Sequence, residues 1–135
     1  MFLDAPKVVK ALDKATRENL KRIGAFIMDD ARKSIRPRKK RSKPGNPPNS
    51  HAGFLRKGIL YGFDVARRSL VVGPIRLNQK SGTAPEALEY GGPSIIDYGP
   101  NKGKRVSIKA RPFMVPAFEK NKDELPGLWK NSVRS

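Results

Sequence analysis

The feature that most constrains this fold is a window, residues 31–63, that contains no Asp and no Glu. Its cationic residues are Arg32, Lys33, Arg36, Arg38, Lys39, Lys40, Arg41, Lys43, Arg56 and Lys57. Within this window, residues 43–53 hold three prolines and two glycines. Proline lacks the amide donor and glycine is costly to order, so this part predicts neither a helix nor a regular strand. We therefore expect a basic, Pro/Gly-rich extended arm at 37–53, between two folded regions.

The composition predicts a single domain, residues 1–135, that gains part of its stability from partners. A chain of 135 residues can bury a modest core, and a hydrophobic fraction of 37% is low for a self-contained globule. The formal net charge of +17 opposes compaction and favours polyanionic partners. Cysteine is absent, which excludes disulfides, and the N-terminal residues lack the apolar run of a signal peptide. We expect a soluble protein, made inside the cell and without a membrane span.

Residues 1–36 carry the pattern of a long amphipathic helix. Its apolar residues, at close to helical spacing, are Val8, Leu12, Ala15, Leu20, Ile23, Ile27, Ala31 and Ile35. Asp4 and Pro6 favour the start of a helix. Pro37 is expected to end it, because proline disfavours the helical conformation of the residue before it.

Residues 54–112 predict a sheet region that contains one short helix. Apolar side chains alternate at 59–65, and a second apolar run follows at 69–74 after a turn at Arg67 and Arg68. This spacing predicts a β-hairpin.

A short helix and a second pair of strands are expected next. Pro85 favours a helix start at 85–90, and the Gly-Gly-Pro sequence at 91–93 stops it. Residues 94–98 and 104–110 predict two more strands, joined by a turn rich in glycine and proline.

Residues 113–135 predict two short helices, because Pro126 and Gly127 interrupt an apolar helical pattern. The residues expected to anchor this C-terminal region on the sheet are Phe113, Phe118, Leu125 and Trp129. The element order predicts an α+β fold: a long N-terminal helix and C-terminal helices packed on a small, mainly antiparallel sheet, with the extended basic arm between them.

The sequence offers no catalytic or metal-binding constellation. His51 is the only histidine and lies in the arm, so a zinc site would need several carboxylates near it. Glu86 and Glu89 would share one face of the short helix, where two carboxylates can act as general acid and general base if their environments differ. On so basic a chain, we favour a solvated or salt-bridged face for both. We therefore expect no enzyme activity, no cofactor and no metal.

The basic run at 36–43 has three interpretations. It can be a generic nuclear-localisation or polyanion motif, a solvated loop, or a contact to DNA phosphates or to an acidic protein surface. The charge density and the lack of acids favour contact with a partner. The candidate contact residues are Arg36, Arg38, Lys39, Lys40, Arg41 and Lys43. Tyr61 and Phe63 could stack on bases, but their alternation with Ile59 favours a place in the core.

Three blocks of the chain together resemble a known family. They are PGNPPNSHAGFLRKGILYGFD at 44–64, APEALEYGG at 84–92 and ARPFMVPAFEKN at 110–121. Their order and spacing are similar to those of the tailed-bacteriophage neck and tail-completion proteins, also called head–tail joining, tail-component or virion-morphogenesis proteins. The residues that carry the resemblance are Gly53, Leu55, Arg56, Leu88, Glu89, Gly91, Arg111, Pro112, Phe113, Pro116 and Ala117.

The resemblance implies a non-enzymatic virion protein of the neck, made in the host cytoplasm. Such proteins form a ring of identical subunits, commonly six, through which the genomic DNA passes. One face of the ring binds the head connector or stopper protein, and the other binds the tail tube or tail terminator protein. The basic run at 36–43 is not part of the family pattern, so it can line the bore or hold an acidic neighbour. A stand-alone basic nucleic-acid-binding protein is the alternative that the charge of +17 leaves open.

Overall fold

The computed structural model describes residues 5–75, 84–96 and 99–130. The elements in order are α1 (Ala5–Ser34), α2 (Phe54–Lys57), β1 (Ile59–Asp64), β2 (Ser69–Pro74), α3 (Ala84–Tyr90), β3 (Gly92–Ile95), β4 (Arg105–Ile108), α4 (Met114–Lys122) and a 3₁₀ helix, η1 (Pro126–Trp129). This order confirms the predicted α+β class. The predicted N-terminal helix, 1–36, and the predicted C-terminal region, 113–135, include residues 1–4 and 131–135, which lie outside the described residues.

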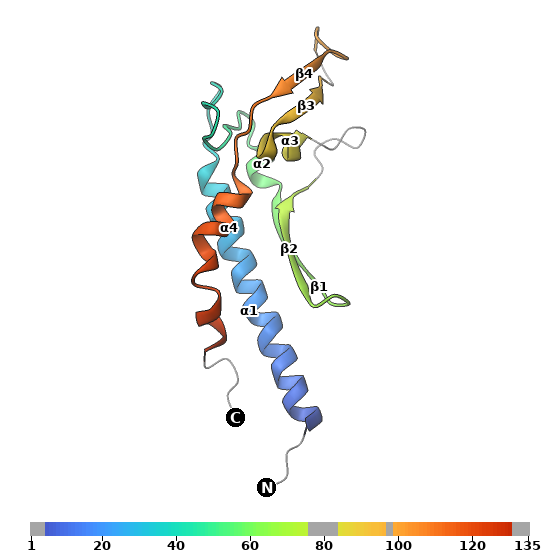
Figure 1. Ribbon diagram of the computed structural model, residues 1–135, viewed down its shortest axis with the longest axis vertical. Helices are drawn as coiled ribbons and strands as arrows, with labels where there is room; N and C mark the ends of the chain where they lie inside the picture. The colour runs from blue at the N-terminus through green and yellow to red at the C-terminus, as the bar shows by residue number, and fades with distance from the viewer. Residues whose placement is uncertain (1–4, 76–83, 97–98, 131–135) are drawn as a thin grey trace.

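Helix α1 forms the long axis of the molecule, and the other elements are arranged along it (Figure 1). The apolar spacing found in the sequence places Ile23, Ile27 and Ala31 in the core and also buries Ala15. Ile35, just beyond the helix, is buried as well. The helix ends three residues before Pro37, in agreement with the sequence prediction.

The hairpin β1–β2 packs on one side of α1 (Figure 1). The two strands are antiparallel, with Ile59 opposite Pro74 and Asp64 opposite Ser69. The hairpin lies close to α1 at Gly24. A Cβ added to this residue would lie 2.8 Å from Tyr61 Cδ2 and 2.9 Å from Leu70 Cδ1. A side chain at this position would therefore require Tyr61 or Leu70 to shift.

Strands β3 and β4 form a second antiparallel hairpin, near the upper end of α1 in Figure 1. The described strands therefore form two separate two-stranded sheets. Strand β3 begins two residues earlier than the predicted 94–98 and ends at Ile95, and part of the predicted segment, 97–98, lies outside the described residues. Pro93 can occupy β3 because a strand of a two-stranded sheet has a free edge that needs no amide donor.

Helix α4 packs along α1, on the side away from the β1–β2 hairpin (Figure 1). This differs from the expected packing of the C-terminal region on the sheet. Phe113 is buried at the start of α4 and joins the core, and Leu125 packs against that core. Phe118 and Trp129 keep 46% and 38% exposure, so they are not the main anchors. The core is made by Ile23, Ile27, Ala31, Ile35, Leu55, Ile59, Phe113 and Ala117.

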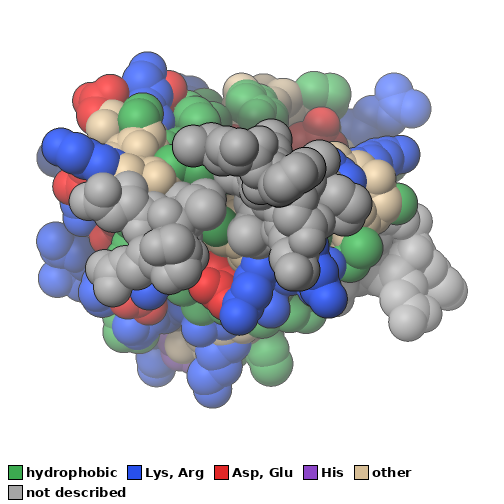
Figure 2. Space-filling model, turned by 90° about the horizontal axis from the view of Figure 1, so that it is seen from below, with side chains coloured by type: hydrophobic (Ala, Val, Ile, Leu, Met, Phe, Trp, Pro, Cys, Tyr) green, Lys and Arg blue, Asp and Glu red, His purple; other side chains and the backbone are tan. Residues whose placement is uncertain are grey.

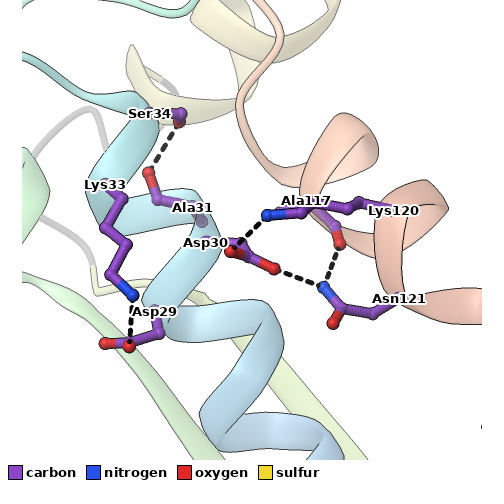
Figure 3. Close-up of polar contacts among 8 residues, drawn as sticks. All are labelled: Asp29, Asp30, Ala31, Lys33, Ser34, Ala117, Lys120 and Asn121. Atoms are coloured by element: carbon purple, nitrogen blue, oxygen red, sulfur yellow. Dashed lines mark hydrogen bonds and ion pairs between the residues drawn. The ribbon is translucent and has the colours of Figure 1, made fainter. Parts of the chain in front are cut away.

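Polar bonds fix the pair of helices α1 and α4 (Figure 3). Lys120 Nζ donates to Asp30 Oδ1 at 2.9 Å, and Asn121 Nδ2 donates to Asp30 Oδ2 at 2.8 Å. The bond from Lys120, and then that from Asn121, lowers the pKa of Asp30 from 3.8, although burial acts in the opposite direction. The charged carboxylate therefore holds α4 against α1.

Candidate functional site

The basic arm, 37–53, is a closed loop at the C-terminal end of α1, not an extended segment. Arg36 and Asn49 form an isolated parallel bridge at its base, and the N–H of Ser50 donates to the carbonyl of Arg36 at 3.0 Å. Inside the loop, Asn49 Nδ2 donates to the carbonyl of Lys40 at 2.7 Å. These bonds between its two halves turn the arm back on itself.

Two further bonds attach the arm to the segment between β4 and α4. The N–H of Gly45 donates to the carbonyl of Ala110 at 2.9 Å, and Arg111 Nε donates to the carbonyl of Ser42 at 3.1 Å. Gly45 adopts a φ of 84°, a conformation that glycine reaches without strain. The position of the arm is thus set by residues more than sixty positions away in the sequence.

The folded arm surrounds a hollow of ≈ 580 Å³. The cationic residues that line it are Lys33, Arg36, Arg38, Lys40, Arg41 and Lys43. Its other lining residues are Ser34, Ser42, Asn46, Pro47 and Asn49. Five of the six predicted contact residues therefore lie together at one concave surface, whereas Lys39, the sixth, is exposed and does not line the hollow.

Sequence reasoning missed part of this site. Lys33 belongs to the last turn of α1, and its Nζ lies 3.1 Å from Asp29 Oδ2. Asn46 and Asn49 lie in the Pro/Gly-rich half of the arm, and nothing in their spacing indicates that they face the basic half. Arg32, in the same acid-free window, has a structural role instead, because its guanidinium donates to the carbonyl of Ile59 at 2.7 Å.

The second and third blocks of the family resemblance meet at Glu89. This residue is buried, and its carboxylate accepts the N–H groups of Phe113 at 2.8 Å, Met114 at 2.9 Å and Val115 at 2.7 Å. These are the first amides of α4, which have no acceptor within the helix. The negative charge also stabilises the positive end of the helix dipole. The expectation of a solvated or salt-bridged Glu89 is wrong, whereas Glu86 is exposed as expected.

Other residues of these two blocks keep α3 and α4 together. The N–H of Arg111 donates to the carbonyl of Leu88 at 2.6 Å. Gly91 adopts a φ of 75°, and an added Cβ would lie 3.1 Å from the N of Ala110 and from the O of Ile108. Because both neighbours are backbone atoms, a side chain at Gly91 has little room. Pro112 is half-buried beside this junction.

The first block reaches the same core from α2. Leu55 is buried in the cluster that contains Phe113 and Ala117, while Arg56 is exposed. Gly53 precedes α2 with a φ of 75°. Pro116, in the third block, is exposed on α4. Residues distant in the sequence, from all three blocks, therefore support one core.

The described residues do not bring potential metal ligands together. Within them, no group of three His, Cys, Asp or Glu lies close enough to hold a metal ion. His51 is exposed in the arm. Also within the described ranges, no helix has the length and apolar character needed to cross a membrane.

Comparison with protein-family models, with curated proteins and with solved structures finds no significant match to this chain.

Proposed function

We propose that the chain is a non-enzymatic structural subunit of a tailed-phage virion. Copies of it form a ring, with six as the expected number, at the head–tail junction. The ring joins the head connector or stopper protein to the tail tube or tail terminator protein, and genomic DNA passes through it. The resemblance of the three blocks supports the location, and the exposed apolar surface of the subunit supports the assembly.

The observation that carries the assembly is the number of large apolar side chains left exposed on the hairpins and short helices. The most exposed, each above 50%, are Phe54, Val65, Val71, Tyr90 and Ile95. Hydrophobic groups are also visible between Lys and Arg side chains at the end of the molecule seen in Figure 2. We infer that neighbouring subunits cover these exposed apolar side chains in the ring.

The two hairpins offer a second route to assembly. Each described strand pairs with one partner, so each sheet has two edges with unpaired backbone groups. An isolated two-stranded hairpin is marginally stable, and such edges can pair with a strand from another chain. We expect subunits in the ring to add strands across their interfaces.

The junction at Glu89 supports the family resemblance. Residues of separate sequence blocks meet there in direct hydrogen bonds, as expected if the blocks are parts of one structural pattern rather than chance similarities. The basic run at 36–43 is then an addition to that pattern, placed at the end of α1 that lies near the β3–β4 hairpin (Figure 1).

Native mass spectrometry tests this proposal, with the purified chain alone and with connector-capped heads or isolated tails. We expect a closed oligomer, or a monomer that assembles when heads or tails are added. Val71→Glu and Ile95→Glu should disrupt assembly, whereas Lys102→Glu, on an exposed turn, should not. A monomer that ignores both heads and tails would refute the proposal.

The basic hollow favours one alternative, a stand-alone nucleic-acid-binding protein. Such a protein would bind DNA or RNA as a monomer, with a steep dependence on salt. Neutralising Arg38, Lys40 and Arg41 would abolish its activity, whereas a neck subunit with the same changes would still form rings.

A further inference from the structure

The geometry points to the hollow of the arm as a binding site for the phosphodiester backbone of a nucleic acid, without preference for base sequence. This inference adds a ligand to the proposed function. It rests on that function for the place where the chain meets DNA, which is the ring. It goes further by assigning the ligand class and by separating the lining residues from the other cations of the arm.

The charges that line the hollow match a chain of phosphates. Arg36, Arg38 and Arg41 carry planar guanidinium groups that can donate two parallel bonds to a phosphate. Lys40 and Lys43 add point charges, the charge of Lys33 is partly offset by Asp29, whose Oδ2 lies 3.1 Å from Lys33 Nζ, and no acidic residue is among the described residues that line the hollow. Without a bound anion, these cations repel one another, so an anion is stabilised at this surface.

Of the neutral hydrogen-bond donors in the hollow, the Ser42 hydroxyl is available to bind a ligand. Ser42 lines it, and its hydroxyl oxygen is buried with no hydrogen-bond partner among the described residues. Buried hydroxyl groups normally have a partner, so this one is consistent with a ligand that supplies an acceptor. Ser34 and Asn49, by contrast, already donate to the carbonyls of Ala31 and Lys40.

The hollow has a defined shape before any ligand binds. Asn49 joins its two halves at Lys40, and Arg111 holds the carbonyl of Ser42. Gly45 is attached to Ala110. Binding therefore orders side chains more than backbone, which reduces the entropic cost of association.

The spacing of charge favours a nucleic acid over an acidic peptide. Along the helix axis, each strand of duplex DNA carries a charge about every 3.4 Å, whereas an extended peptide presents side chains of one face only about every 6.6 Å. Six cations around one hollow of ≈ 580 Å³ suit the denser ligand. No aromatic residue is among the described residues that line the hollow, so base stacking is not provided and the backbone is the part recognised.

Fluorescence anisotropy of the full chain tests this inference. The probes are a labelled mixed-sequence DNA duplex of 20 base pairs, its single strand, and a poly-glutamate peptide of matched charge. Binding is measured over a series of salt concentrations. We expect the DNA probes to bind at least tenfold more tightly than the peptide, and a second duplex of different base sequence to bind as tightly as the first.

The decisive pair of variants is Lys40→Gln, inside the hollow, and Lys39→Gln, its neighbour outside. We expect Lys40→Gln to reduce the slope of log K against log salt by about 0.9 on the duplex, as for one lost phosphate contact. The slope for Lys39→Gln should stay close to that of the unmodified chain.

A triple variant extends the comparison. Arg38, Lys40 and Arg41 changed to Gln should reduce the slope by about 2.7. The control, Lys10, Lys14 and Lys21 changed to Gln, removes equal charge from α1, about 20 Å or more from the arm, and should change the slope little. All variants should keep the thermal unfolding midpoint of the unmodified chain.

Three outcomes would overturn the inference. They are equal effects of Lys39→Gln and Lys40→Gln, equal effects of the two triple variants, and peptide binding as tight as DNA binding. None of these outcomes bears on ring formation, which native mass spectrometry measures separately. Rings without DNA binding would leave the proposed function standing, and DNA binding by a monomer would favour the alternative function.

Discussion

Removal of the Glu89 carboxylate should destabilise the protein more than removal of any exposed charge. The carboxylate accepts three backbone N–H groups at 2.7–2.9 Å, and these belong to Phe113, Met114 and Val115. A hydrogen bond to a charged group contributes about 1.5–3 kcal/mol, and an unsatisfied buried donor costs about 1–3 kcal/mol. The loss of stability on removing the Glu89 carboxylate therefore combines three lost hydrogen bonds with the cost of the donors left unsatisfied.

The terms do not simply add, because water can reach some of the freed donors. The N–H of Phe113 is buried, whereas Val115 is 42% exposed. We expect Glu89→Ala to lower the free energy of unfolding by about 3–5 kcal/mol. This is a large share of the ~5–15 kcal/mol typical of a domain.

Glu89→Gln should cost less, about 1–2 kcal/mol. Its carbonyl oxygen can still accept from Phe113 and Met114, but its amide group would face the N–H of Val115, and the negative charge at the start of α4 is lost. Glu86→Ala, on the exposed face of α3, is the control and should change stability by no more than about 0.5 kcal/mol.

Urea unfolding at neutral pH, followed by circular dichroism, measures these differences. The reasoning would be refuted if Glu89→Ala cost less than about 1 kcal/mol, or if Gln cost more than Ala at this position. Either result would mean that the carboxylate does not hold the start of α4.

Three further variants test other contacts. Because the pKa of Asp30 is lowered from 3.8, its stabilising effect is complete above that pH and is lost as the pH falls through the lower, folded-state pKa. Asp30→Asn should thus lower the free energy of unfolding by roughly 1 kcal/mol at neutral pH, a modest cost because Lys120 is exposed. The difference in unfolding midpoint between this variant and the unmodified chain should vanish as the pH is lowered below 3.8. Gly91→Ala should cost about 1–3 kcal/mol in urea unfolding, because its φ is positive and backbone atoms surround it, whereas Gly62→Ala, with open space, should not destabilise. Gly24→Ala should lower the thermal unfolding midpoint despite the better helix propensity of alanine, and a higher midpoint would show that Tyr61 moves aside without cost.

The elements of the fold were largely predictable from local sequence. The helix at 5–34, the first hairpin, the short helix after Pro85 and the break at Pro126 follow from apolar spacing and from proline and glycine chemistry. The second hairpin was placed less well, because its strands are four residues long and too short for a clear alternation.

The candidate site was predictable in composition but not in shape. The density of Lys and Arg at 36–43 was visible in the sequence, and it identified five residues that line the hollow. The way the loop folds back determines that Lys39 does not line the hollow, whereas Lys33 and Asn46 do. The sequence carries no periodic signal for such a loop.

The sequence by itself determined where helices and strands can form and where the positive charge concentrates, because these depend on neighbours within a few residues. The tertiary structure alone decided that Glu89 is buried at the start of α4, that α4 packs on α1, and that Arg111 holds the arm. The bonds made by the Glu89 carboxylate and by Arg111 Nε join residues 24 to 69 positions apart. A contact of that range depends on the packing of the whole chain, so no local pattern encodes it.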